Sequence, residues 1–255
     1  MSSFEDVIAK KKAQIEAAKA KAKAARTDLI HKPTTGEKIE FINPEDASNK
    51  IRVIFDNSGS MGSLIKDKEA IEHAKDGCVE LLRSSVPNRD AYAIHLLNTT
   101  VWGEESNLPE CIKNSTLMTD LVSLASAIAD ESVKATGGTP LFEKIKEAQK
   151  ATPSATRFIA FSDGEPNNFI NEAEVISTAN VKETPIDTVF FGSTGSSGAR
   201  VMKNLADKTR GIFLLYDPSK PLSFKDLFKY LSPGKRLMLM NAEFKAKLER
   251  GEIRA

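Results

Sequence analysis

A seven-residue stretch at positions 56–62 combines one carboxylate with two hydroxyl groups. Its sequence is Asp-Asn-Ser-Gly-Ser-Met-Gly, so Asp56, Ser58 and Ser60 recur at alternate positions. A backbone that is extended and then turns brings three such side chains to one point, and the two glycines permit the turn. Carboxylate and hydroxyl oxygens are hard donors that suit Mg²⁺ and serve zinc or copper poorly. The stretch therefore predicts a site for a hard divalent cation.

Two distant segments supply further oxygen donors. Gly-Gly-Thr-Pro-Leu at 137–141 contains Thr139, and Phe-Ser-Asp-Gly-Glu-Pro at 161–166 contains Asp163. Each donor also has a simpler interpretation. Asp56 suits the cap of the following helix, Thr139 suits the cap of a helix begun by the proline after it, and Asp163 with its glycine is a common turn pair. The occurrence of all three segments in one chain favours a shared site.

The elements around these segments alternate between strands and helices. We expect strands at 51–55, 91–97, 156–162, 186–191 and 212–216 with a short edge strand at 100–102, and helices at 64–82, 119–133, 141–150, 171–180, 199–208 and 224–231. This order predicts an α/β fold with a mostly parallel sheet covered on both faces. Open sheets of this kind bind ligands at the carboxyl ends of their strands, where Asp56 and Asp163 are expected.

The pattern D-x-S-x-S resembles the metal-ion-dependent adhesion site of von Willebrand factor A domains. The other two segments are similar to that family's threonine loop and its T/S-D-G loop, and the resemblance covers roughly residues 48–231. It implies a Rossmann-like, doubly wound fold and a site for Mg²⁺ or Mn²⁺. The metal ligands implied by the resemblance are Asp56, Ser58, Ser60, Thr139 and Asp163.

In this family an acidic side chain of a partner protein completes the coordination. A six-coordinate Mg²⁺ with three hydroxyl ligands and one or two carboxylates keeps a position for water, which the partner's Asp or Glu replaces. The resemblance therefore implies a protein partner that presents a carboxylate to the metal. The residues expected on the rim that selects this partner are Asn57, Met61, Glu165 and Asn167.

Two biological roles are compatible with this resemblance. One is an adaptor for an intracellular machine, such as the ATPases of the MoxR and chelatase groups or the tellurite-stress systems. The other is a structural or assembly protein of a virus or a secretion apparatus, which docks through helical ends. A Mg²⁺-dependent phosphotransferase of the haloacid dehalogenase type also presents an aspartate after a strand, but it has a second acid two residues later, where this chain has Ser58. We therefore expect a binding module and not an enzyme.

Charge divides the 255 residues into an acidic body and basic ends. The net charge is +1, yet residues 1–32 carry +4 and residues 232–255 carry +3, so the residues between them carry −6. Such a body argues against nucleic acid as a ligand of the central domain. The predicted organisation is an Ala/Lys-rich helical extension at 1–32, a linker at 33–47, the α/β domain at 48–231 and a basic helical tail at 232–255. Apolar residues recur at helical spacing in both ends, which predicts docking onto this domain, another copy or another protein.

The expected location is the cytoplasm, without membrane contact. No apolar run reaches the roughly 20 residues that span a bilayer, and the acidic start of the chain lacks the basic-then-apolar pattern of a signal peptide. Cys78 and Cys111 lack zinc-type spacing, and two reduced thiols are favoured over one disulfide.

Overall fold

A computed structural model describes residues 42–85, 90–101, 104–105, 107–167, 171–193 and 195–216. The predicted extension at 1–32, the helix at 224–231 and the tail at 232–255 lie outside the described residues, as does most of the predicted linker. The described end of the linker contains a 3-10 turn, η1 (Pro44–Asp46), and the side chain of Asn43 caps this turn by accepting a 3.0 Å bond from the Glu45 N–H.

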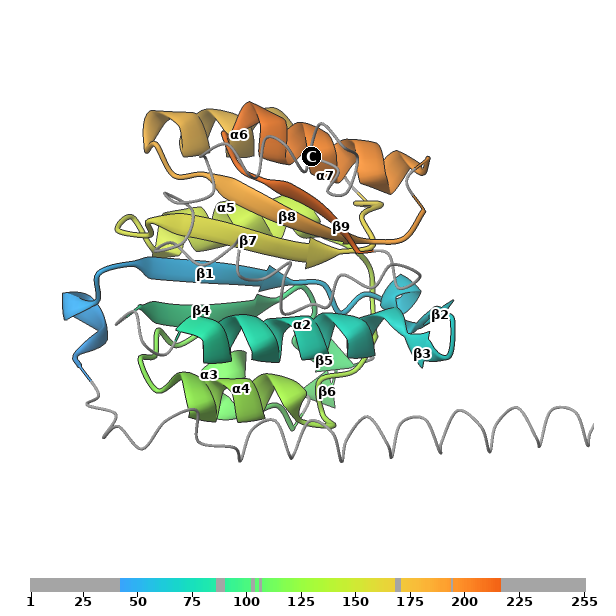
Figure 1. Ribbon diagram of the computed structural model, residues 1–255, viewed down its shortest axis with the longest axis horizontal. Coiled ribbons are helices and arrows are strands. Elements are labelled where there is room, and N and C mark those ends of the chain that lie inside the picture. Colours follow the sequence, from blue (N-terminus) through green and yellow to red (C-terminus); the bar gives the residue numbers. More distant parts are fainter. Residues whose placement is uncertain are drawn as a thin grey trace, which may run out of the picture.

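A five-stranded parallel sheet forms the centre of the molecule (Figure 1). Its strands are β1 (Lys50–Phe55), β4 (Ala91–Leu96), β7 (Arg157–Ser162), β8 (Ile186–Phe191) and β9 (Phe213–Tyr216). The order is β4-β1-β7-β8-β9, and all four pairings are parallel. Every residue of β4, β7 and β8 is buried, as expected where helices cover both faces of a parallel sheet. The predicted Rossmann-like, doubly wound α/β fold is confirmed.

Helices form a layer on each face of the sheet. The main helices are α2 (Ala70–Ser85), α4 (Leu121–Ala129), α5 (Leu141–Ala151), α6 (Glu172–Val181) and α7 (Ser197–Lys208). Successive residues of a strand point to opposite faces, so Val53 packs into the core under α2 and α4, while Ile54 packs into the core under α5, α6 and α7. Figure 1 shows α2 in front of the sheet and α5 behind it.

The helix predicted at 64–82 begins later than expected. A hairpin of β2 (Leu64–Ile65) and β3 (Lys68–Glu69) comes first, and α2 starts only at Ala70. Lys66, between the two strands, has a φ of 62°, a left-handed conformation that interrupts a right-handed helix. Residues 64–69 contain neither glycine nor proline, so their composition gives no sign of this break.

The region between β4 and α5 also differs from the prediction. A short helix, α3 (Glu110–Lys113), contains Cys111 and lies in a stretch where the sequence predicts no helix. The helix predicted at 119–133 is confined to α4, because the carboxylate of Asp120 caps its start with a 3.0 Å bond from the Ser123 N–H. Two antiparallel strands of two residues each, β5 (Thr100–Val101) and β6 (Glu104–Glu105), occupy the place of the predicted edge strand.

Two compositional expectations can be compared with the structure. Cys78 and Cys111 are both free thiols, as predicted. Among the helices of the described ranges, none combines the length and the apolarity that a bilayer crossing requires.

Gly211, which precedes β9, packs directly against the backbone of β8. A Cβ atom at Gly211 would lie 1.8 Å from the carbonyl oxygen of Ile186, a backbone atom of β8. Because backbone cannot yield as a flexible side chain does, Gly211→Ala has to separate β8 from the start of β9. We expect a loss of about 2–4 kcal/mol in the free energy of unfolding, measured by urea titration. Gly195→Ala is the matched control, since nothing lies within 4 Å of a Cβ there; equal losses in both variants would contradict this packing.

Candidate functional site

The two predicted acidic ligands meet at one edge of the sheet. Asp56 directly follows β1, and Asp163 directly follows β7. The strands pair with Phe55 opposite Phe161, and the Asp56 N–H extends this ladder with a 2.9 Å bond to the Phe161 carbonyl. Parallel neighbours end at the same edge of a sheet, so residues from distant parts of the chain become neighbours here.

Four side chains at this edge form a continuous chain of polar contacts. The hydroxyl oxygens of Ser58 and Ser60 lie 3.0 Å apart, and the Ser60 hydroxyl donates to Asp163 Oδ1 over 3.0 Å. At the other end, Asp56 Oδ1 accepts a 2.7 Å bond from the Ser58 N–H. The structure thus brings four of the five predicted ligands together, and their role in binding a metal stays a prediction.

Thr139, the fifth predicted ligand, lies on a loop that is held beside the first. The Gly59 N–H donates to the Gly137 carbonyl over 3.0 Å, and Gly137 has a left-handed φ of 69°. Thr139 is only 5% exposed, and its carbonyl accepts a 3.1 Å bond from the Asn167 N–H. Within the described ranges, its hydroxyl donates to neither aspartate and contacts neither serine by a hydrogen bond. The backbone therefore places Thr139 near the four linked side chains, but within the described ranges the Thr139 hydroxyl is not hydrogen-bonded to any of them.

Ser162 holds the first carboxylate and was not singled out from the sequence as a site residue. Its hydroxyl donates to Asp56 Oδ2 over 2.5 Å and accepts a 2.9 Å bond from the Gly164 N–H. Both oxygens of Asp56 are therefore oriented by serine donors. The available signal was its place beside Asp163 at the carboxyl end of a strand that neighbours β1.

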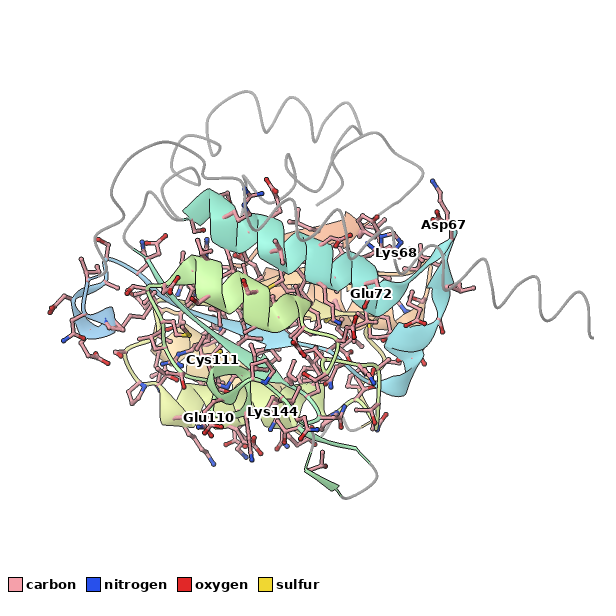
Figure 2. All side chains as sticks on the ribbon, turned by 90° about the horizontal axis from the view of Figure 1, so that it is seen from below. Asp67, Lys68, Glu72, Glu110, Cys111 and Lys144 are labelled. Atoms are coloured by element: carbon pink, nitrogen blue, oxygen red, sulfur yellow. The ribbon has the colours of Figure 1, made fainter. Side chains whose placement is uncertain are left out.

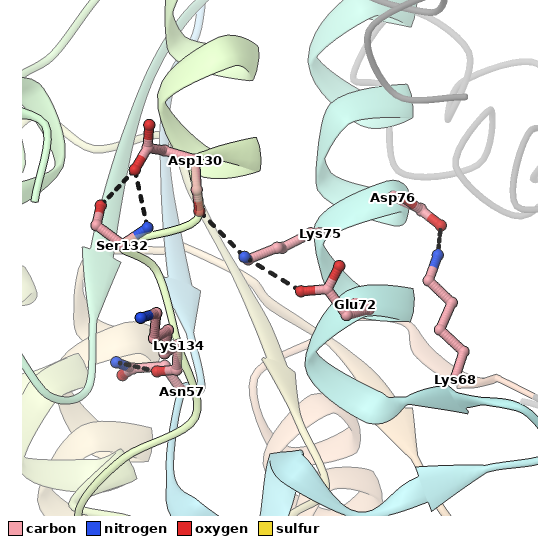
Figure 3. A network of polar contacts seen from close by, with 8 residues as sticks. All are labelled: Asn57, Lys68, Glu72, Lys75, Asp76, Asp130, Ser132 and Lys134. Atoms are coloured by element: carbon pink, nitrogen blue, oxygen red, sulfur yellow. Dashed lines mark hydrogen bonds and ion pairs between the residues drawn. The ribbon is translucent and has the colours of Figure 1, made fainter. Parts of the chain in front are cut away.

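Asn57 joins the first loop to two others and does not face a partner. Its Nδ2 donates to the carbonyls of Asn98, at 2.8 Å, and Lys134, at 3.3 Å, while its Oδ1 accepts a 2.9 Å bond from the Asn98 N–H. Figure 3 shows the contact with Lys134. Asn57 is 2% exposed, and Met61 is fully buried in the core under α2. The expectation that these two side chains lie on the rim is wrong. The Asn57 amide is hydrogen-bonded to neighbouring loops, and the Met61 side chain packs in the hydrophobic core.

The segment that leads to the threonine loop is also fixed to α2. Lys75, a buried lysine, donates a 3.1 Å bond to the Asp130 carbonyl and lies 3.2 Å from the Glu72 carboxylate (Figure 3). The Asp130 side chain in turn accepts a 2.8 Å bond from the Ser132 N–H. These contacts secure the start of the segment, and Asn57 secures its middle.

Electrostatics set this edge apart. Burial raises the pKa of Asp56 to about 6, and the nearby charge of Asp163 adds to the increase, against hydrogen bonds from Ser162 and Ser58 that lower it. The pKa of Asp163 is also raised, mainly by burial. In the described part of the chain, no Lys, Arg or His nitrogen lies within 4 Å of either carboxylate. Two adjacent carboxylates with raised pKa values favour the binding of a positive ion between them.

The donor set of this edge fits a hard divalent cation. Two carboxylates and the hydroxyls beside them are suitable ligands for Mg²⁺ or Mn²⁺. The described residues include no group of three or more His, Cys, Asp or Glu side chains that could hold a metal ion, so an ion at this edge would depend on two carboxylates and the hydroxyl groups beside them. Asp56, Ser58, Ser60 and Asp163 would therefore hold the ion, with Thr139 as the neighbouring hydroxyl.

Glu165 and Asn167 are the two predicted rim residues that lie at the surface. The Glu165 carboxylate accepts a hydrogen bond from the hydroxyl of Ser197, at the start of α7. A Cβ atom on Gly138 would meet Asn167 Nδ2 at 2.3 Å, so the Asn167 side chain lies directly over the threonine loop. Both residues therefore flank the polar chain.

Comparison with protein-family models and with curated proteins gives no match. Solved structures do match the fold. A von Willebrand factor type A protein from Catenulispora acidiphila has a TM-score of 0.50 and 17% identity, over 72% of this chain and 42% of that chain. The pilus adhesin SpaC from Lactobacillus rhamnosus GG has a TM-score of 0.50 and 12% identity, over 80% and 32%. The manganese-loaded TRAP protein of Plasmodium vivax has a TM-score of 0.44 and 16% identity, over 72% and 68%.

These similarities concern the fold alone, because the identities are low. The chain shares the α/β architecture of von Willebrand factor A domains, and it corresponds to 42% of the length of the Catenulispora acidiphila protein.

Asp56→Asn tests the electrostatics of the metal-free site. The folded-state pKa of Asp56 is about 6 against an ordinary 3.8, so its charge destabilises the fold above pH 6, and this effect disappears as the pH falls toward 4. Asparagine keeps the acceptor at Oδ1 and carries no charge. In EDTA we expect the variant to gain about 1–3 kcal/mol of unfolding free energy at pH 7.5, and progressively less between pH 6 and pH 4.

Urea titrations at several pH values measure this difference. Asp207→Asn is the control, since Asp207 is an exposed carboxylate of α7 whose ion pair with Lys203 is open to solvent. A Asp56→Asn variant no more stable than the wild type at pH 7.5 would show that Asp56 carries no electrostatic penalty.

Proposed function

We propose that this chain is a metal-dependent protein-interaction module. Its site would hold Mg²⁺ or Mn²⁺, and a partner protein would present an Asp or Glu carboxylate to the bound ion. The observation that carries this proposal is the convergence of Asp56 and Asp163, linked through Ser58 and Ser60, without a neighbouring cation in the described ranges. The von Willebrand factor A-like fold is consistent with it.

Exposure gives the direction from which a partner would approach. Asp56 and Ser58 are buried, whereas Ser60 is exposed and Asp163 is half-buried. The open side of the site is therefore the Ser60–Asp163 side. An incoming carboxylate would reach the ion there and replace a water.

The charge of Glu165 makes partner binding at this side depend on the metal. It lies beside Asp163, and its charge contributes to the raised pKa of that residue. Without a metal, three negative groups at this edge repel an acidic partner, and a divalent cation reverses the sign of the interaction. Partner binding should for this reason respond sharply to the metal.

An adaptor for an intracellular, cytoplasmic machine is the role that we favour. The alternative is a structural or assembly protein that docks through residues 1–32 and 232–255, whose charge and apolar spacing suit contact with another surface. A Mg²⁺-dependent phosphotransferase has less support, because Ser58 stands where such an enzyme needs a general acid, and its hydroxyl is in contact with Ser60.

Calorimetric titration with MgCl₂ and MnCl₂ tests the metal site. We expect one divalent site in the wild type and no measurable binding in Asp56→Ala, because the variant loses the buried charged ligand. Glu165→Gln should keep the site, since it removes a surface charge and no predicted ligand. Circular dichroism checks that each variant is folded, and wild-type affinity in Asp56→Ala would refute the ligand assignment.

Partner capture in Mg²⁺ and in EDTA tests the interaction. We expect a partner that is retained in Mg²⁺ and released by EDTA, that Asp56→Ala fails to capture, and that loses binding when one of its own acidic residues is changed to alanine. Capture that persists in EDTA and disappears on deletion of residues 1–32 or 232–255 would support docking through the ends instead. Hydrolysis of a phosphate ester that Asp56→Asn abolishes would support the enzyme.

A further inference from the structure

A second site lies beside the edge strand β4. A cavity of about 510 Å³ is lined by residues of β1, β4 and α5 and by the segment around the end of α3, and none of the five predicted metal ligands is among them. Its volume is within the range of about 300–1,000 Å³ found for small-molecule pockets. This cavity is not explained by the metal-dependent function.

Two cationic or titratable side chains reach the cavity from the sheet. Arg52 of β1 pairs with Ala93 of β4, so it points to the same face as His95, two residues further along β4. Both side chains line the cavity, and both are only 8% exposed. Opposite them, α5 contributes Lys144, Glu147, Ala148 and Ala151 to the lining.

Both side chains carry buried nitrogens without partners. Arg52 donates one bond from Nη1 to the Ser115 carbonyl, at 3.2 Å, but its Nε has no hydrogen-bond partner among the described residues. The same holds for Nε2 of His95. No described carboxylate lies within 4 Å of the Arg52 guanidinium. Unsatisfied buried donors are unfavourable, and a ligand that accepts hydrogen bonds would satisfy them.

The rest of the lining is also positive. Lys113 of α3 and Lys144 of α5 add two cations, while Glu147 is the one acidic residue. Glu147 lies 2.7 Å from Lys144, but its side chain is 66% exposed, so solvent screens that pair at the mouth of the cavity. In Figure 2 the labelled Lys144 lies on the same side of the molecule as Glu110, at the start of α3. Burial and the charges of Arg52 and Lys144 lower the pKa of His95 to about 4, so this imidazole is neutral at pH 7.

We propose that this cavity binds the phosphate group of a small organic phosphomonoester. Among the cations of the lining, Arg52 has a buried N–H without a partner in the described ranges, and Lys144 is paired with the only acid of the lining, Glu147. A guanidinium at the base of a lining with more cations than acids suits a phosphate dianion better than a single carboxylate. The planar guanidinium of Arg52 offers an unused N–H at depth, and Lys144, which is paired with Glu147, adds positive charge at the mouth. Neutral His95 donates or accepts one further bond. The volume exceeds what a phosphate ion fills, so the remainder holds the organic part of the ligand.

Titration calorimetry of the full chain in EDTA tests this site, because EDTA prevents phosphate from binding through a metal at the other edge. The probes are ribose 5-phosphate and AMP, with ribose, adenosine and succinate as comparisons. We expect saturable binding of at least one phosphomonoester, no binding of the uncharged probes and weaker binding of succinate. Asp56→Ala should leave this affinity unchanged, which separates the two sites.

Lys144→Gln and Lys146→Gln form a matched pair for the same titration. Both lysines belong to α5, both are about a quarter exposed and both pair with a glutamate, but only Lys144 lines the cavity. We expect Lys144→Gln to weaken phosphomonoester binding roughly tenfold and Lys146→Gln to leave it within about twofold. Arg52→Gln should weaken it at least as much as Lys144→Gln where the variant folds.

Histidine NMR signals locate the bound probe independently of the variants. The ring signals of His95 should shift on addition of the phosphomonoester, whereas those of His73, which does not line the cavity, should stay in place. Absence of saturable binding, equal weakening by Lys144→Gln and Lys146→Gln, stronger binding of succinate, or an unmoved His95 signal would each overturn the proposal.

Discussion

The side-chain amide of Asn57 is the contact on which the geometry of the acidic edge depends. The amide donates to the carbonyl of Asn98, after β4, and accepts from the N–H of the same residue. It also donates to the carbonyl of Lys134, before the threonine loop, so one residue sets the spacing between its own loop and two others. Burial of a side-chain amide is favourable when its polar atoms are hydrogen-bonded. Both N–H groups and the oxygen of the Asn57 amide are used in this way, and all three hydrogen bonds are made to main-chain groups. With the first loop fixed in this way, the pairing of β1 with β7 and the bond from Ser60 to Asp163 hold the two carboxylates near each other although they repel. Neutral hydrogen bonds provide the rigidity, and the charged groups remain available for a cation.

The charges of the molecule are arranged in two separate regions. Asp56 and Asp163 lie where parallel strands end, and the cationic cavity lies beside the edge strand β4, between the sheet and α5. Asp56 in the first region and Arg52 in the second are buried, and neither has an ion-pair partner within 4 Å among the described residues. Such groups reduce stability, because burial of an unpaired charge is unfavourable. Their signs are consistent with the divalent cation and the phosphomonoester that we propose as ligands.

The fold and most of the acidic edge could be predicted from the sequence, because both depend on local patterns. Short apolar runs that alternate with helical patterns identified all five strands of the sheet, and the parallel arrangement placed Asp56 and Asp163 at one edge. Other features depend on contacts between distant residues. The burial of Asn57 and Met61, the hairpin around Lys66 and the orphaned nitrogens of Arg52 and His95 follow from tertiary packing, which no spacing within one segment records. Polar residues next to a site are thus hard to assign to rim or framework from sequence alone.

The pairing of β1 with β7 has a consequence for the synthesis of the protein. The hydrogen bond from Ser162 to Asp56 joins residues 106 positions apart, and β4 and the helices α2, α3, α4 and α5 lie between them in sequence. Contacts of this separation form late, because the entropy of closing a long loop must be overcome first. A nascent chain that has emerged only as far as α5 lacks the strand that orients Asp56. The acidic edge is for this reason complete only when β7, which carries Ser162 and leads to Asp163, has been translated and has paired with β1.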